Sequence, residues 1–170
     1  MDRQSERDRQ ALARSREKAR RESDAVVEDA FRIYDIRMLG REDVAGHGTI
    51  VLSLAPRAAV TPRTDGGRML KHFSGKAWIS QSDHEFVRLE FEVIDTVSIG
   101  WGVRARVHPG SRLRFERRKV NGEVWLPAEA ACTVSGRLAL LKGVRARASS
   151  QFSNYRKFVV DTDTTCRNPG

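Results

Sequence analysis

The stretch Val87-Arg88-Leu89-Glu90-Phe91-Glu92-Val93 decides the class of fold. Its odd positions carry aliphatic or aromatic side chains and its even positions carry charges, and this period of two is typical of a half-buried β-strand. The same alternation recurs at 103–107 and 112–116, where arginines take most of the charged positions. The sequence therefore predicts an antiparallel sheet with one apolar face and one face of arginine and glutamate.

Short polar turns separate the predicted strands. Asn121-Gly122 is the clearest of them, because a type I′ hairpin turn needs positive φ at both central positions. Connections this short force neighbouring strands to be antiparallel, so the sequence predicts a meander. The turns expected elsewhere are 40–46, 82–84, 100–102, 108–110, 127–128 and 142–143. The strands expected between them are 31–39, 47–55, 75–80, 85–99, 103–107, 112–120, 123–126, 132–141 and 144–152, with short helices at 23–30 and 68–73.

The chain of 170 residues has a formal net charge of +9, from 31 Lys and Arg against 22 Asp and Glu. We expect a charged arm at 1–22, a β body at 23–158 and a tail at 159–170. The arm has almost no apolar side chains, which predicts a frayed helix or a disordered segment. A solvated linker is the simpler interpretation of the arm, and an arm that grips phosphates or anionic lipid is the alternative.

No constellation for catalysis or metal binding is evident in the sequence, so we expect a protein that is not an enzyme and needs no cofactor or metal. The four histidines lack a second ligand at a standard spacing. Glu90 and Glu92 share one strand face, but Arg88 beside them favours a ladder of ion pairs over an acid/base pair. Cys132 and Cys166 fit either a disulfide or two free thiols. The chain as written has neither a secretory signal nor eighteen consecutive apolar residues, which excludes a membrane-spanning helix.

Aromatic side chains raise the question of what covers the apolar face. Trp78 lies within a predicted strand and Trp125 near the start of another, and large aromatics on such a face usually fill a core. The body offers only two short helical stretches to cover a many-stranded sheet. A curved sheet left uncovered can form a half-barrel around a lipid-sized cavity. A filled core and an open cavity both remain compatible with the sequence.

A set of short motifs resembles uncharacterised bacterial envelope proteins that are grouped with outer-membrane lipoprotein-sorting proteins. These proteins are similar to the periplasmic lipoprotein carrier and to its outer-membrane receptor. The resemblance covers about 23–158. The motifs are Phe73-Ser-Gly-Lys-Ala-Trp-Ile, Val87-Arg-Leu-Glu, Ile99-Gly-Trp-Gly, Pro109-Gly-Ser, Phe115-Glu, Val124-Trp-Leu-Pro and Phe152-Ser-Asn-Tyr-Arg-Lys-Phe.

The resemblance implies a mainly β, α+β fold in which a curved antiparallel sheet holds lipoprotein acyl chains in an apolar cavity. It implies a place in the periplasm or cell envelope, acyl chains as ligands and an envelope protein as partner. It also implies that a further half and a signal peptide precede the charged arm, so that this chain would be a truncated product. Alternation and the implied shape together suggest these cavity residues: Trp78, Val87, Leu89, Phe91, Val93, Leu113, Phe115, Trp125, Leu138 and Leu140.

Two other classes of binding protein fit the basic charge. A nucleic-acid-binding module would use arginine-lined strands as its electrostatic footprint, although aromatics for base stacking do not interleave with the arginines. A structural protein would rest its basic face on anionic membrane surfaces. Steep salt dependence of binding would favour either of these, whereas acyl-chain binding depends weakly on salt.

Overall fold

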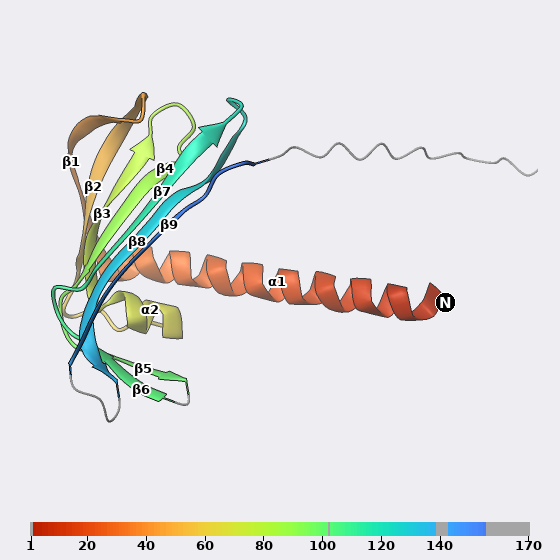
Figure 1. Ribbon diagram of the computed structural model, residues 1–170, viewed down its shortest axis with the longest axis horizontal. Coiled ribbons are helices and arrows are strands. Elements are labelled where there is room, and N and C mark those ends of the chain that lie inside the picture. The colour runs from red at the N-terminus through yellow and green to blue at the C-terminus, as the bar shows by residue number, and fades with distance from the viewer. Residues whose placement is uncertain (1, 102, 139–142, 156–170) are drawn as a thin grey trace, which may run out of the picture.

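The computed structural model describes residues 2–101, 103–138 and 143–155, which form two helices and one antiparallel sheet of nine strands (Figure 1). The helices are α1 (Asp2–Ile33) and α2 (Asp65–Leu70). The strands are β1 (Tyr34–Val44), β2 (His47–Pro56), β3 (Phe73–Ser80), β4 (Phe86–Val93), β5 (Val97–Trp101), β6 (Val103–Val107), β7 (Arg112–Val120), β8 (Val124–Leu138) and β9 (Val144–Gln151). The predicted fold class, mainly β with a curved antiparallel sheet, is confirmed.

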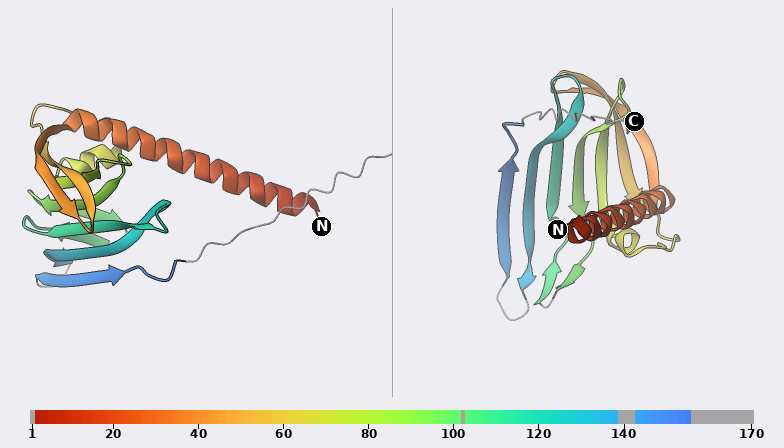
Figure 2. Two further views of the ribbon diagram at one scale, coloured as in Figure 1. Left: turned by 90° about the horizontal axis from the view of Figure 1, so that it is seen from above. Right: turned by 90° about the vertical axis from the view of Figure 1, so that its right-hand side faces the viewer.

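The order of the strands is β1-β2-β3-β4-β7-β8, with β9 on the far side of β8. The β5–β6 hairpin leaves this path and pairs with the carboxyl-terminal part of β8 through β6. The predicted meander therefore holds for β1 to β4 and again for β7 to β9. In the described chain β1, β5 and β9 each pair with one strand only, and the sheet curves between β1 and β9 (Figure 2).

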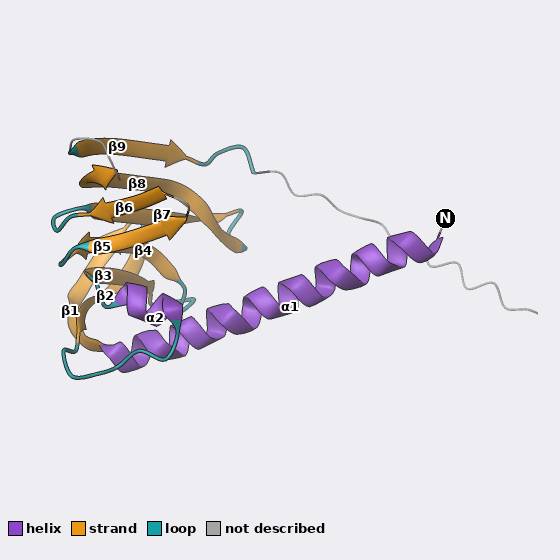
Figure 3. Ribbon diagram, turned by 90° about the horizontal axis from the view of Figure 1, so that it is seen from below, coloured by secondary structure: helices purple, strands orange, loops and turns teal. Residues whose placement is uncertain are grey.

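α1 is much longer than the short helix predicted at 23–30, and it runs through the whole of the expected arm. No glycine or proline interrupts residues 2–33, and ion pairs one turn apart support the exposed part of the helix. The described side chains from position 10 to position 24 are exposed, and the helix projects away from the sheet (Figure 3). Among the described side chains of α1, packing is confined to the last turns, where Ile33 is fully buried and Asp29 contacts the loop before α2.

Three strand boundaries differ from the prediction for reasons visible in the backbone. The first hairpin turns at Ala45-Gly46, where both φ angles are positive, so β1 continues through Gly40 to Val44. β8 continues through Pro127 because the pairing register shifts there, opposite Arg117, and a bulge is one of the few places where a strand tolerates proline. The predicted strand 85–99 is divided into β4 and β5, because Ile94 leaves the sheet and donates its N–H to His72 O.

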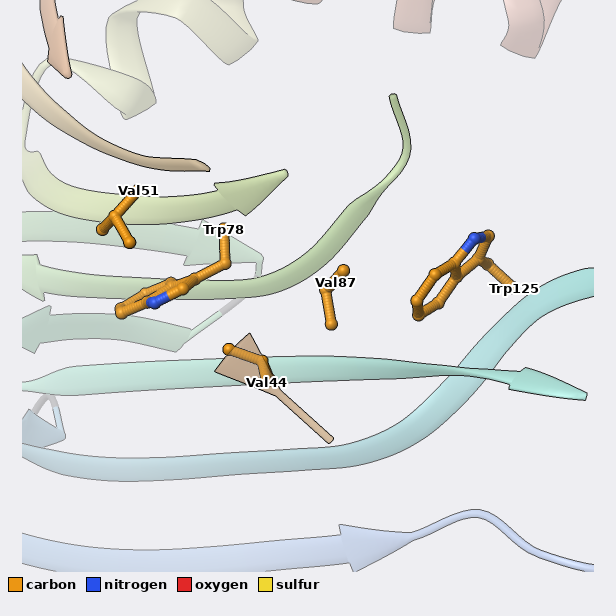
Figure 4. Packing of buried hydrophobic residues seen from close by; sticks show 5 residues of the cluster. All are labelled: Val44, Val51, Trp78, Val87 and Trp125. Carbon is orange, nitrogen blue, oxygen red and sulfur yellow. The ribbon is translucent and has the colours of Figure 1, made fainter. Parts of the chain in front are cut away.

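The most buried apolar cluster of the described residues lies near the turns of the β1–β2, β3–β4 and β7–β8 hairpins (Figure 4). Two tryptophan rings and three valines form this hairpin cluster, and each side chain is at most 5% exposed. The His47 ring meets the Trp125 ring edge-on at 4.8 Å, which joins β2 to β8 across the intervening strands. The members of the hairpin cluster are Val44, Val51, Trp78, Val87 and Trp125.

Candidate functional site

The pairing register assigns the side chains of the central strands to two opposite faces. Leu54, Gly75, Phe91, Leu113 and Cys132 pair in one continuous row across β2, β3, β4, β7 and β8. Directly paired residues point to the same side of a sheet. The apolar face is formed by this row and by the row Leu52, Ala77, Leu89, Phe115 and Ala130. The charged face carries the alternate residues Lys76, Arg88, Glu90, Glu92, Arg112, Arg114 and Glu116.

Phenylalanine rings and a partly exposed leucine characterise the apolar face. Phe73 packs edge-on against Phe91 with ring centroids 6.4 Å apart. Phe86 and Phe115 form a second, tilted pair at 6.1 Å. Leu113 is 42% exposed, and most of the other large side chains of this face are half-buried. This face is therefore only partly covered by the described part of the chain.

Five of the ten predicted cavity residues, Leu89, Phe91, Val93, Leu113 and Phe115, lie together on the apolar face. Val93 is 1% exposed, so it belongs to the packed base of the face. Leu138 is the last residue of β8, and the placement of its side chain is not described. Leu140 lies outside the described residues.

Trp78, Val87 and Trp125 do not join those five residues, because they pack in the hairpin cluster. Trp78 pairs with Arg88, which places the indole on the charged side of the sheet. Val87 breaks the alternation of β4 because the register shifts between Trp78 and Ile79, leaving Val87 unpaired at a β-bulge. The expectation that all ten side chains line one cavity is therefore wrong.

The charged face is a ladder of cross-strand ion pairs between β4 and β7, as the alternation of charges predicts. Arg88 Nε lies 2.5 Å from Glu116 Oε1, and Arg112 Nε lies 3.1 Å from Glu92 Oε2. Burial alone would raise the pKa of Glu116, but the hydrogen bond from Arg114 and the charge of Arg88 lower it below its ordinary value. The Glu116 carboxylate is thus stabilised in the ionised form.

A cavity of about 630 Å³ crosses five strands, and it takes three consecutive residues from each. In every triplet the outer two residues point to the charged face, as Lys76 and Ser74 do on either side of Gly75. The neighbouring apolar side chains Leu89 and Phe115 are absent from its lining. The cavity is therefore a trough on the charged face, and the backbone of the central row forms its floor. The two flanking rows are mostly charged or hydroxyl side chains, and each ends in one alanine, Ala55 on β2 or Ala131 on β8.

Polar partners of the two buried tryptophans were missed by the sequence reasoning. Trp78 Nε1 donates to Glu42 at 2.8 Å, and Trp125 Nε1 donates to Asp83 at 2.9 Å. Asp83 also accepts from Lys119, and these hydrogen bonds hold the pKa of its carboxyl below the ordinary value. A carboxylate 36 or 42 residues away from its tryptophan has no local signal in the sequence.

In residues 2–101, 103–138 and 143–155, no group of three or more His, Cys, Asp or Glu side chains could hold a metal ion. Within the same ranges, no helix combines the length and the apolar character needed to cross a bilayer. Cys132 is half-buried and has a free thiol, whereas Cys166 lies outside the described residues.

Comparisons with protein-family models, with curated proteins and with solved structures found no match to this chain.

Proposed function

We propose that this protein binds acyl chains without catalysis, on the apolar face of its sheet, in a lipoprotein-sorting role in the bacterial cell envelope. Its ligands would be lipid or lipoprotein acyl chains, received from or passed to an envelope partner. The motif resemblance supports the envelope role, and the apolar face supports the ligand. No nucleotide or metal is needed, because transfer of apolar surface out of water supplies the binding energy.

The observation that carries the proposal is the partial exposure of a continuous apolar row on an open sheet. Leu113 is 42% exposed beside half-buried Phe91 and Phe115, although leucine and phenylalanine are residue types that are usually buried. Each methylene of an acyl chain that covers such a surface contributes about 0.8 kcal/mol. The two packed phenylalanine pairs, one edge-on and one tilted, also give a rigid surface that loses little conformational freedom on binding.

The trough on the charged face is a poor place for the same ligand. Its walls carry ionised pairs such as Glu92 with Arg112, which are partly hydrated. An acyl chain laid along these side chains would remove water from charges without replacing their hydrogen bonds. An acyl chain should therefore bind to the apolar face and not in this trough.

A titration of delipidated protein with a fluorescent diacyl lipopeptide tests the proposal, first at low salt and then at roughly 0.5 M salt. We expect saturable one-to-one binding that survives the salt. Leu113→Asp should weaken it by about tenfold or more, because the acyl chain would have to desolvate an ionised carboxylate. Phe91→Asp should abolish it in a variant that circular dichroism shows to be folded.

Thr133→Asp is the matched control, because it adds the same charge to an exposed position on the charged face one strand away. Its lipopeptide affinity should equal that of the unmodified protein. Equal losses in Leu113→Asp and Thr133→Asp, or binding that disappears at high salt, would contradict the apolar face as the site.

A further inference from the structure

Four arginines at the β6–β8–β9 end of the sheet have no acidic partner among the described residues, unlike the arginines of the ion-pair ladder. This arginine cluster consists of Arg106, Arg137, Arg145 and Arg147, and all four side chains are exposed. Arg88, Arg112 and Arg114 on the same sheet each lie within 4 Å of a glutamate carboxylate. Among the residues that the structure describes, none forms an ion pair with any member of the cluster.

The register concentrates these four charges on one side of the sheet. Arg106 on β6 is directly paired with Arg137 on β8. Arg145 and Arg147 on β9 are paired with Ser135 and Thr133 of β8, which lie two and four residues before Arg137. Positions separated by two along a strand share a face, so all four arginines and both hydroxyl side chains point to the charged face.

This arrangement costs free energy in the absence of a ligand. Like charges at directly opposed positions destabilise a strand pair, and Arg106 faces Arg137 in that way. Guanidinium groups are well suited to phosphate, which they bind through paired hydrogen bonds, and hydroxyl groups add further donors. An anionic surface laid over the cluster would remove the repulsion.

We propose that the arginine cluster docks the protein onto the phosphate groups of an anionic lipid bilayer. The docking surface lies on the opposite face from the apolar row, so it is independent of the acyl-binding proposal. Arginines on three neighbouring strands form a two-dimensional array, which matches a plane of lipid headgroups. Nucleic acid is the other polyphosphate that such a patch could meet.

The surroundings of the cluster favour a bilayer over nucleic acid. Single-stranded nucleic acids are held by aromatic rings interleaved with basic side chains. The charged-face positions of β8 from Pro127 to Arg137 and of β9 from Arg145 to Gln151 include no aromatic residue. Each arginine near an anionic membrane surface contributes about 1 kcal/mol, so four of them give reversible, salt-sensitive docking.

Co-sedimentation with vesicles of phosphatidylglycerol and phosphatidylcholine, at low salt, tests this surface. We expect Arg145→Gln/Arg147→Gln to lower the vesicle partition coefficient about 30-fold, since two membrane-facing charges are lost. Arg145→Lys/Arg147→Lys should keep most of the binding, because charge is retained. The control Arg14→Gln/Arg16→Gln removes two exposed arginines from α1, and it should change the vesicle partition coefficient less than about threefold.

Several outcomes would overturn the proposal. They are equal loss of binding in the α1 variant and the β9 variant, equal binding to vesicles of phosphatidylcholine alone, and tighter binding to duplex DNA than to anionic vesicles at the same salt. The lipopeptide titration separates this proposal from the acyl-binding one. Arg145→Gln/Arg147→Gln should leave lipopeptide affinity unchanged, whereas Leu113→Asp should leave vesicle docking nearly unchanged.

Discussion

The two ends of the sheet satisfy their polar groups in different ways. At the hairpin cluster, both indole N–H groups donate to carboxylates, Trp78 to Glu42 and Trp125 to Asp83. At the arginine cluster, four exposed cations have no ion-pair partner among the described residues. One end of the sheet thus supplies partners for its own polar groups, whereas the other end exposes arginines that have no acidic partner in the described part of the chain.

This difference shows which end is shaped by folding and which is available for binding. A buried donor without a partner costs about 1–3 kcal/mol, so the hairpin cluster has to supply its own acceptors. An exposed arginine is hydrated and needs no partner to fold. We therefore expect substitutions at the hairpin cluster to change stability, and substitutions at the arginine cluster to change binding.

Trp78→Ala should have the largest effect on stability. The indole is 4% exposed and packs with the other members of the hairpin cluster, so its removal should cost about 3–5 kcal/mol of unfolding free energy. Urea denaturation followed by circular dichroism would measure the loss. Leu113→Ala is the control, because this leucine is 42% exposed and should cost much less. Equal losses would show that the hairpin cluster is not the stabilising core.

Gly75→Ala should have the next largest effect. A Cβ at this position would collide with Glu90 O and with the Phe91 ring, which lies over the glycine on the apolar face. Relief of the collision would move β3 away from β4, at a cost of about 1–3 kcal/mol. Thermal unfolding would measure it. Gly143→Ala is the control, since among the described residues its Cβ would meet only Gly136 O, at an ordinary contact distance of 3.8 Å.

The sheet was predictable where local signals and the strand period agree. Asn121 and Gly122 both have positive φ, as the type I′ turn requires, and the alternation of β4 and β7 correctly assigns Leu89, Phe91, Leu113 and Phe115 to one face. Both signals are local, because they depend only on neighbouring residues. No knowledge of the sheet order is needed to use them.

The features that the sequence did not predict depend on contacts between residues far apart in the chain, which leave no local sequence pattern. Val87 continues the apolar alternation in the sequence, yet the bulge at this point directs it into the hairpin cluster. Pro127 looks like a turn residue, but the register shift opposite Arg117 accommodates it within β8. The grouping of the four arginines could not be predicted either, because Arg106 lies opposite Arg137 only when β6 pairs with β8.

The stability of the junction between α1 and α2 should depend on pH. This junction lies outside both the hairpin cluster and the arginine cluster. The Asp29 carboxylate accepts from the Thr64 and Arg63 N–H groups and from the Thr64 hydroxyl. The backbone hydrogen bond from Thr64 is the main cause that lowers the pKa of Asp29 below the ordinary value of 3.8. A lowered folded-state pKa gives stability that is present above 3.8 and lost as the pH falls toward the folded value.

Asp29→Asn removes the pH dependence of stability that comes from the Asp29 carboxylate, so a comparison with the unmodified protein measures it. We expect the variant to be less stable than the unmodified protein at neutral pH, and the difference in urea midpoint to shrink as the pH falls below 3.8. Hydrogen exchange should show the loss first in the last turns of α1. A difference that stays constant down to the lowest pH would contradict the role of the ionised carboxylate.

The smallest effects should come from single arginines, and their signs should differ between the ladder and the arginine cluster. Arg112→Gln removes an exposed pair with Glu92 and should cost between 0 and about 1 kcal/mol of unfolding free energy. Arg137→Gln removes a like charge directly opposite Arg106, so it should cost nothing or add a few tenths of a kcal/mol. Urea titrations at low salt would measure both, and roughly 0.5 M salt should bring the two variants together by screening. In this account the arginine cluster is unfavourable for the folded protein when no ligand is bound. A loss of stability in Arg137→Gln would mean instead that Arg137 stabilises the fold through contacts within the protein. The case for a bilayer as its partner would then weaken.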